Sequence, residues 1–224
     1  MNIFITGANR GLGLGFVQHY ANRGDNIIAG CRIPERAVEL KELVPKEHIL
    51  RIDVADPGSI SEAASRVREL VNRLDILINN AGVGEDTSAE LPSFDDLIRT
   101  YSTNAIGPVL LTKQLKTHLA KGSKVVNVTS RMGSITDNTS GGYYDYRMSK
   151  AALNMATKNL HLELAGVGVV VFAIHPGWVR TDMGGASALL SIEESVSGMV
   201  QVIDTAGIDD GGSFLGYDGS EIPW

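Results

Sequence analysis

The sequence predicts an α/β fold in which helices cover both faces of a doubly wound parallel sheet. Three observations support this prediction. Short apolar runs alternate with helical patterns along all 224 residues, several of the runs are apolar on both alternating faces, and the chain opens with strand, glycine turn and helix. No repeat, low-complexity tract or linker interrupts the alternation, so we expect a single domain over residues 1–224.

Six apolar segments are predicted as strands. Parallel strands are covered on both sides, so they read as nearly continuous apolar runs rather than as strict alternation. The segments are residues 3–5 (IFI), 26–29 (NIIA), 48–52 (HILRI), 76–78 (ILI), 124–128 (KVVNV) and 169–174 (VVVFAI).

Helical patterns fill the intervals between these strands. Residues 59–72 place their apolar side chains on one stripe and follow Pro57, a residue favoured in a first helical turn. Residues 97–119 repeat leucine and tyrosine at similar spacing, and residues 149–164 are rich in alanine and leucine. Another apolar spacing of this kind begins at Leu14.

Composition excludes several classes of partner and site. A net charge of −6 argues against a nucleic acid bound on a broad basic surface. The sequence shows neither a signal-peptide pattern nor an apolar run of the roughly 18 to 20 residues needed to span a bilayer. Cys31 is the only cysteine and the histidines show no ligand spacing, so we expect no disulfide, no metal and a cytoplasmic setting.

The first turn has the spacing Thr6-Gly7-x-x-x-Gly11-x-Gly13. One interpretation is a tight connection that needs glycine conformations. The other is a phosphate site, since Gly11 and Gly13 fall where the N–H groups of a beginning helix lack partners. The turn alone does not decide between them.

Five further motifs follow in order after the predicted strands and helices. They are NNAG at residues 79–82, TNAIGP at 103–108, VTSRMGS at 128–134, YRMSK at 146–150 and PGWVRTDM at 176–183. Together with the opening turn they resemble the short-chain dehydrogenase/reductase family along essentially the whole chain. The stretches SRMGSI…YYDYRMSKAALN and FLGYDGSEIPW are most similar to its C-factor/sniffer-like carbonyl reductases. The resemblance implies a Rossmann-like fold and a nicotinamide dinucleotide seated on the glycines.

The spacing of Tyr146 and Lys150 suits proton transfer. A tyrosine with an ordinary pKa of about 10 needs a neighbouring cation to act near neutrality, and a lysine four residues on lies one helical turn away. The resemblance implies that Tyr146 is the general acid and base, that Lys150 also holds the nicotinamide ribose, and that Ser130 binds the carbonyl oxygen. It further implies that Asn104 kinks its helix and holds a water linked to Lys150.

Each of these roles has a competitor in the sequence. Tyr143 and Tyr144 lie beside Tyr146, but neither has a lysine four residues on. Thr129 and Ser134 compete with Ser130, and the extra segment TDNTSGG before Tyr146 leaves the placement of Ser130 open. Asn104 is also suited to capping or bending its helix.

Two arginines favour NADP, as NADPH, over NAD. The second predicted strand ends in Cys31 and Arg32 without the acidic residue that binds a ribose 2′-hydroxyl, and Arg10 lies in the glycine turn. Both suit a 2′-phosphate, although both are also plausible solvated charges, and NAD stays possible. The full set of expected cofactor contacts is Gly7, Asn9, Arg10, Gly11, Leu12, Gly13, Arg32, Asp53, Val54, Asn80, Ala81, Gly82, Tyr146, Lys150, Pro176, Val179 and Thr181. Asp53 is placed beside the adenine by resemblance, with helix capping as its alternative.

The predicted reaction is hydride transfer between NAD(P) and a small neutral carbonyl. Residues 186–190 offer an apolar cover, with Trp178, Met132, Tyr143 and Trp224 as further surface, and the cover has no cation after Arg180. A second interpretation is a dinucleotide-binding regulatory or signalling protein, whose relatives often lose the tyrosine or lysine. A sugar-nucleotide epimerase or dehydratase would need another glycine spacing and a larger region after Met183.

The predicted helices 97–119 and 149–164 carry much apolar surface. In the family that the chain resembles, these helices form the subunit interface, so the resemblance implies a homodimer or homotetramer.

Overall fold

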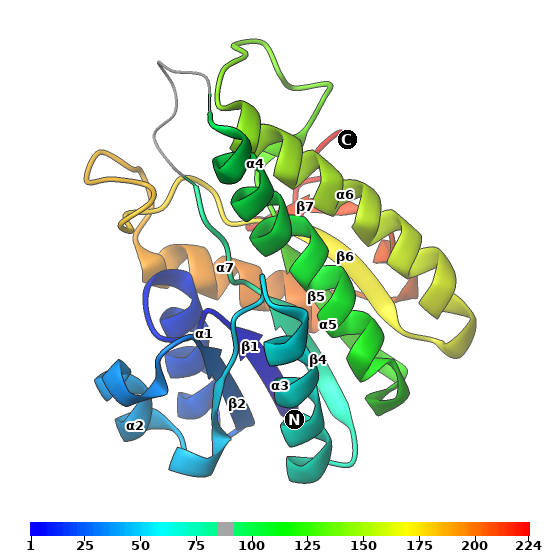
Figure 1. Cartoon of the computed structure of the whole chain (residues 1–224). Helices are drawn as coiled ribbons and strands as arrows, with labels where there is room; N and C mark the ends of the chain where they lie inside the picture. The colour runs from blue at the N-terminus through cyan, green and yellow to red at the C-terminus, as the bar shows by residue number, and fades with distance from the viewer. Residues whose placement is uncertain (85–91) are drawn as a thin grey trace.

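A computed structural model describes residues 1–84 and 92–224 of the protein. Its centre is one seven-stranded sheet in the order β3-β2-β1-β4-β5-β6-β7, and all neighbouring strands pair in parallel (Figure 1). The strands are β1 Asn2–Thr6, β2 Asn26–Cys31, β3 Ile49–Arg51, β4 Leu74–Asn79, β5 Leu119–Val128, β6 Val170–His175 and β7 Phe214–Gly216. This doubly wound parallel sheet confirms the predicted fold class.

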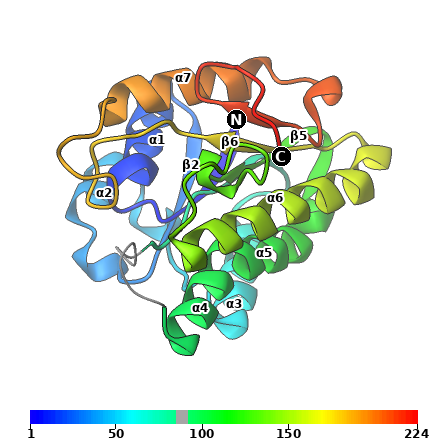
Figure 2. The ribbon, with the colours of Figure 1, turned by 90° about the horizontal axis from the view of Figure 1, so that it is seen from above.

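Helices cover both faces of the sheet, as the view from above makes plain (Figure 2). The helices are α1 Gly11–Asn22, α2 Val38–Leu43, α3 Pro57–Leu70, α4 Phe94–Tyr101, α5 Gly107–Leu115, α6 Tyr144–Leu164 and α7 Ile192–Thr205. One apolar core lies between the sheet and α1, α2 and α7, and a second lies between the sheet and α3, α5 and α6. Within the described residues, none of these helices has the length and apolarity to cross a bilayer.

The predicted helix 97–119 is wrong at both ends and at its centre. It begins at Phe94 because Ser93 and Asp96 form a capping box, a start signal that the apolar spacing does not reveal. A π-helical segment, Ser102–Ile106, separates α4 from α5. The helix ends at Leu115, and Leu119 instead starts β5, where it pairs with Leu74.

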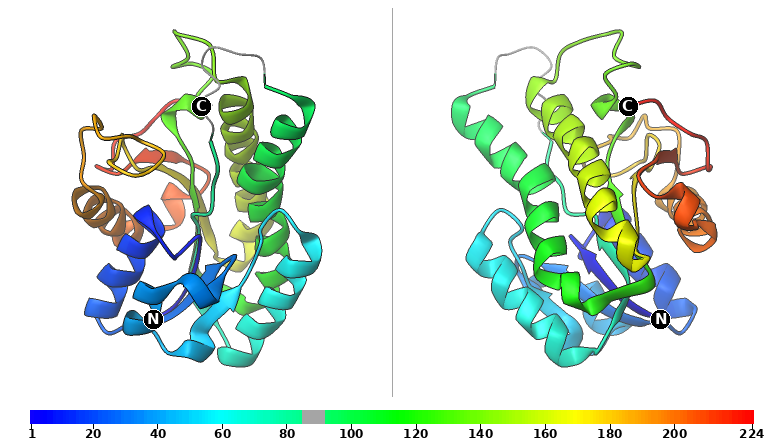
Figure 3. Two further views of the ribbon diagram at one scale, coloured as in Figure 1. Left: turned by 60° about the vertical axis from the view of Figure 1, so that its left-hand side comes forward. Right: turned by 90° about the vertical axis from the view of Figure 1, so that its right-hand side faces the viewer.

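Other boundaries also move. Helix α6 is one continuous helix (Figure 3) that begins at Tyr144 rather than residue 149, and its bounds include both Tyr146 and Lys150. Helix α3 spans Pro57–Leu70, against a prediction of 59–72. Strand β7 and helix α7 have no counterpart in the prediction, although Ser191 and Glu194 form a capping box that marks the start of α7.

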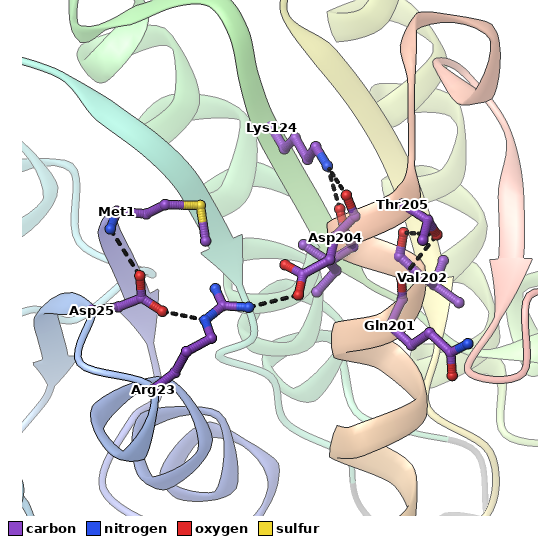
Figure 4. A network of polar contacts seen from close by, with 9 residues as sticks. Met1, Arg23, Asp25, Lys124, Gln201, Val202, Asp204 and Thr205 are labelled. Atoms are coloured by element: carbon purple, nitrogen blue, oxygen red, sulfur yellow. Dashed lines mark hydrogen bonds and ion pairs between the residues drawn. The ribbon is translucent and has the colours of Figure 1, made fainter.

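A chain of ion pairs joins the amino-end edge of the sheet to the end of α7 (Figure 4). The Arg23 guanidinium contacts Asp25 at 2.5 Å and Asp204 at 2.6 Å, and the Met1 amino group contacts Asp25 at 2.8 Å. Lys124 on β5 donates to the Asp204 carbonyl at 2.9 Å. The Lys124 bond gives a partner to a carbonyl at the end of α7 that the helix itself leaves unpaired, and the ion pairs lie at the edge opposite the glycine turn.

Candidate functional site

The direction in which successive strands are added to the sheet reverses between β1 and β4, so the segments that follow these two strands lead away to opposite sides at one edge of the sheet. The glycine turn follows β1, and the NNAG segment follows β4. Thr6 joins them, since its Oγ1 accepts the backbone N–H groups of Asn80 at 3.1 Å and Ala81 at 3.0 Å. The Asn80 side chain donates to the Thr6 carbonyl at 2.9 Å. Hydrogen bonds therefore hold the glycine turn and the NNAG segment together at this edge of the sheet.

The glycines are required by this geometry. Gly7 and Gly11 have φ values of +64° and +55°, in the left-handed region that favours glycine. A Cβ at Gly13 would lie 2.1 Å from the Gly7 carbonyl oxygen, so no side chain fits there. Helix α1 starts directly after Arg10 with no side-chain cap. An uncapped helix N-terminus behind a close glycine turn fits a phosphate group, because its N–H groups are available to an anion.

Asp53 and Val54 lie at the next strand end, after β3. The capping role considered for Asp53 belongs to Asp56, whose carboxylate accepts the Gly58 N–H at 2.8 Å. Asp53 instead accepts the Ala55 N–H at 3.0 Å within its own turn. Val54 packs under the start of α5, where a Cβ at Gly107 would lie 2.2 Å from the Val54 carbonyl oxygen.

Tyr146, Lys150 and Ser130 come together where β5 ends against α6. The Lys150 ammonium donates to the Val128 carbonyl at 2.9 Å and lies 5.7 Å from the centre of the Tyr146 ring. Ser130 is buried and hydrogen-bonded to the Tyr146 hydroxyl. A Cβ at Gly82 would be 3.6 Å from the Lys150 nitrogen, which places this group against the NNAG segment.

Burial dominates the protonation of both groups. It raises the pKa of Tyr146, and the hydrogen bond with Ser130 lowers it by less. Burial lowers the pKa of Lys150 to about 8. Lys150 is not among the causes of the Tyr146 shift, and its role in favouring the phenolate stays a prediction.

Asn104 lies fully buried in the π-helical segment between α4 and α5. Its side chain accepts the Val83 N–H at 2.8 Å and donates to the Val83 carbonyl at 2.8 Å and to the Ser149 hydroxyl at 3.0 Å. It does not cap a helix. A π-segment is a common interruption at functional sites, and here it holds α4 and α6 to the segment after β4.

The competing side chains are occupied elsewhere. The Thr129 hydroxyl donates to Asn154 at 2.7 Å, and the Ser134 hydroxyl accepts the Asp137 N–H at 3.0 Å. Tyr144 is exposed, and Tyr143 precedes α6 with a left-handed φ of +50°. Ser130 and Tyr146 are thus the hydroxyl pair that the fold brings together.

Arg10 and Arg32 lie near the ends of the first two strands. The Ala8 N–H donates to the Gly30 carbonyl at 3.0 Å, which holds the glycine turn beside β2. Arg10 forms an exposed ion pair of 2.6 Å with Asp182. Arg32 is exposed at the end of β2. Asn9 is exposed and Leu12 is half-buried against the first core.

The segment after β6 folds over the glycine turn. The Thr181 methyl group lies 3.7 Å from the position of a Cβ on Gly11, and Thr181 accepts the Gly184 N–H at 3.1 Å. Val179 is buried and bridges to Leu190. The Pro176 carbonyl accepts the Ser195 hydroxyl at 2.6 Å, which anchors this segment to α7.

A cavity of about 220 Å³ opens at the carboxyl ends of β6 and β7, lined in part by Trp178, Leu189 and Leu190. Met132, Tyr143 and Trp224 are not among its described lining residues, and Trp224 instead stacks on Phe214 at 5.5 Å. Arg131 and His175 also line it. The sequence predicts an apolar cover with no cation after Arg180. Arg131, which lies in another segment of the chain, nevertheless lines this cavity.

Two further residues belong to this site and were not predicted. Thr6 ties the glycine turn to the NNAG segment, and Ser149 links Asn104 to α6, where its hydroxyl donates to the Tyr146 carbonyl at 2.8 Å. Thr6 and Ser149 lie within the recognised motifs, but Ala81 and Asn104, with which they bond, lie more than 40 residues away from them in sequence. No local pattern identifies such partners.

Comparison with known proteins agrees with this architecture. A family profile described as short chain dehydrogenase matches residues 1–189. The C-signal protein of Myxococcus xanthus is 47% identical over 154 residues, covering 67% of this chain and 93% of that protein. The carbonyl reductase Sniffer of D. melanogaster superposes with a TM-score of 0.94 at 36% identity, over 100% of this chain and 99% of that one. An NADPH-bound carbonyl reductase from chicken fatty liver gives a TM-score of 0.92 at 37% identity, over 100% and 98%. The order of its motifs, its parallel sheet and these matches show that the chain belongs to the short-chain dehydrogenase/reductase family.

Proposed function

We propose that the protein is an NADP-dependent carbonyl reductase that converts a small neutral aldehyde, ketone or quinone to an alcohol. The main observation in favour is that Ser130, Tyr146, Lys150 and Asn104 converge beside Gly82 at the switch point of the sheet. The titles of the neighbouring structures from D. melanogaster and chicken name carbonyl reductases, which supports the same reaction class.

In this proposal a nicotinamide cofactor, when bound, supplies the hydride. Ser130 orients the carbonyl oxygen through its hydroxyl. Tyr146 donates its phenolic proton to the oxygen as negative charge develops there, and the raised pKa of this tyrosine keeps that proton in place near neutral pH. The Lys150 ammonium would then donate a proton to the Tyr146 phenolate and regain one from solvent, through a water that Asn104 is expected to hold. The phosphates would lie at the uncapped start of α1, held by Gly11, Leu12 and Gly13.

The direct test is a panel of carbonyl compounds assayed with NADPH and with NADH. We expect reduction with NADPH, and a higher kcat/KM for neutral aldehydes and ketones than for keto acids of similar size. A clear preference for keto acids would reject the neutral substrate class, and Arg131 in the nearby cavity would be the first residue to examine.

Arg32→Ala is expected to raise the Kd for NADPH about tenfold, because charge-assisted hydrogen bonds to the 2′-phosphate would be lost. The Kd for NADH, which lacks that phosphate, should stay within about twofold of the wild-type value. Arg36→Ala, an exposed arginine four residues away, is the matched control. Equal losses with both cofactors, or none with NADPH, would contradict the assignment of Arg32.

We also propose that the protein forms a homodimer or homotetramer through α4 and α6. Met148, Met155 and Leu162 repeat every seven residues on α6 and are 47, 64 and 67% exposed. Phe94 and Ile98 expose further apolar surface on α4, which packs beside α6. A stripe of this size on neighbouring helices suits a twofold contact with a second copy.

Light scattering at micromolar protein is expected to give the mass of a dimer or tetramer. Met155→Glu should reduce that mass, since the interface would bury an unpaired charge. Val38→Glu, at an equally exposed position on α2, should leave the mass unchanged. A strictly monomeric wild-type protein would contradict the proposal.

A second candidate is a regulatory or signalling protein that binds a dinucleotide. The name of the M. xanthus relative, C-signal, is the observation that favours it. The presence of both Tyr146 and Lys150 favours the enzyme. Dinucleotide binding without turnover on any member of the carbonyl panel would favour the regulatory alternative.

A further inference from the structure

Arg147 lies between the two proposed catalytic residues on α6, yet its side chain points to a different part of the protein. Its guanidinium donates three hydrogen bonds, to the Gly141 carbonyl at 3.1 Å, the Met132 carbonyl at 3.3 Å and the Ser140 hydroxyl at 2.9 Å. All three acceptors belong to the segment between Ser130 and α6. A planar guanidinium holds several acceptors in a fixed arrangement, which a flexible single-point donor does not.

The segment that Arg147 holds, residues 131–142, rises above the carboxyl edge of the sheet next to the start of α6 (Figure 1). It has internal contacts of its own. Arg131 pairs with Asp137 at 3.2 Å, and the Gly141 N–H donates to Asn138 at 3.0 Å. Most of its residues from Ile135 to Gly141 are nevertheless exposed, so few apolar contacts fix its position.

The junction of this segment with α6 is conformationally demanding. Gly141, Gly142 and Tyr143 have consecutive left-handed φ values of +64°, +69° and +50°. For a bulky residue such as Tyr143 this conformation is an outlier that surrounding contacts must maintain. The Arg147 N–H donates to the Tyr143 carbonyl at 2.9 Å, and the Arg147 side chain holds the two residues before Gly142.

The other end of the segment leads to Ser130. The Met132 carbonyl accepts from Arg147, and the Met132 N–H donates to the Ser130 hydroxyl oxygen at 3.1 Å. Arg147 is therefore two hydrogen bonds away from the hydroxyl that faces Tyr146. The glycine turn and the NNAG segment, by contrast, are held together by Thr6 and Asn80, and among the described residues Arg147 makes no hydrogen bond to them.

We propose that Arg147 is a positioning residue that clamps segment 131–142 and the Ser130 turn to the start of α6, and so fixes the substrate side of the site. This inference rests on the proposed carbonyl reduction. It predicts that loss of the guanidinium weakens capture of the carbonyl substrate without weakening NADPH binding, because the recorded contacts of the guanidinium are with segment 131–142 and not with the glycine turn or the NNAG segment. Fixing the Ser130 turn in this way matters because small displacements of groups near the reacting atoms lower reaction rates strongly.

The test compares Arg147→Met, Arg147→Lys and Ser140→Ala with the wild-type protein and with Arg66→Met as control. Among the described residues, the ion pair of Arg66 is with Glu69 on the exposed face of α3, so its loss should change neither exchange in segment 131–142 nor the KM. In Arg147→Met we expect hydrogen exchange in residues 134–142 to rise about tenfold or more. The KM for the carbonyl should rise about fivefold or more, with the Kd for NADPH within about twofold.

Arg147→Lys should give only partial rescue, because an ammonium replaces three fixed donors with one point. Ser140→Ala removes one bond on the surface and should shift exchange and KM in the same direction by less, which keeps the test valid if Arg147→Met fails to fold. The clamp would be overturned if Arg147→Met left both exchange and KM unchanged. It would also be overturned if KM and the Kd for NADPH rose together. If the wild-type protein reduced no carbonyl, the proposed function would fail, while the exchange measurement would still judge the clamp by itself.

Discussion

Replacing Tyr146 with phenylalanine is expected to lower turnover roughly 100- to 10,000-fold, the usual contribution of a general acid. The change removes one oxygen and leaves the ring that Lys150 faces at 5.7 Å. NADPH affinity should stay within about twofold, because the glycine turn and the NNAG segment that would hold most of the cofactor make no bond to the phenol oxygen among the described residues. Single-turnover kinetics together with cofactor fluorescence titration separate the two effects.

Tyr143→Phe is the control, since this tyrosine lies three residues earlier and also carries a single hydroxyl. It should change kcat by no more than about twofold, as no proton transfer is assigned to it. Near-normal turnover in Tyr146→Phe would place the regulatory interpretation ahead of the reductase.

Lys150→Met is expected to abolish most turnover and yet to stabilise the fold at pH 7. Burial lowers the pKa of Lys150 to about 8 from its ordinary 10.5, so the folded chain holds this charge at a cost. A shift of this size corresponds to up to roughly 3 kcal/mol, and loss of the bond to the Val128 carbonyl offsets about 1 kcal/mol of any gain. The free energy of unfolding should therefore rise by roughly 1 to 2 kcal/mol.

The pH dependence follows from the same shift. Between about pH 8 and 10.5 the unfolded chain binds more protons at this lysine than the folded chain does, so wild-type stability gains from Lys150 as the pH rises through that window. The advantage of Lys150→Met should accordingly be largest below pH 8 and shrink above it. Urea unfolding at a series of pH values measures this. Lys158→Met, on the exposed side of the same helix, should show no such trend, and a Lys150→Met variant less stable than wild type at pH 7 would refute the argument.

Local patterns in the sequence were sufficient for the fold class. Runs such as IFI and VVVFAI are apolar because both faces of a parallel strand are buried, and that requirement does not depend on which strands are neighbours. The spacing of Gly7, Gly11 and Gly13 is likewise local, since it depends on positive φ values and on the close approach within one turn. Tyr146 and Lys150 share a helix face for the same reason, as one helical turn separates them.

The tertiary structure decided what depends on distant partners. Leu119 fits a helical repeat by spacing, but pairing with Leu74 makes it a strand residue. Burial raises the pKa of Tyr146 and the hydrogen bond with Ser130 lowers it by less, and both depend on segments that folding brings to the tyrosine. Arg131 lines the cavity at β6 and β7, and Arg147 reaches the Met132 carbonyl 15 residues away, and no local spacing identifies either contact. Sequence periodicity records which face of an element is buried, whereas the environment of a single polar side chain is set by segments that folding brings to it.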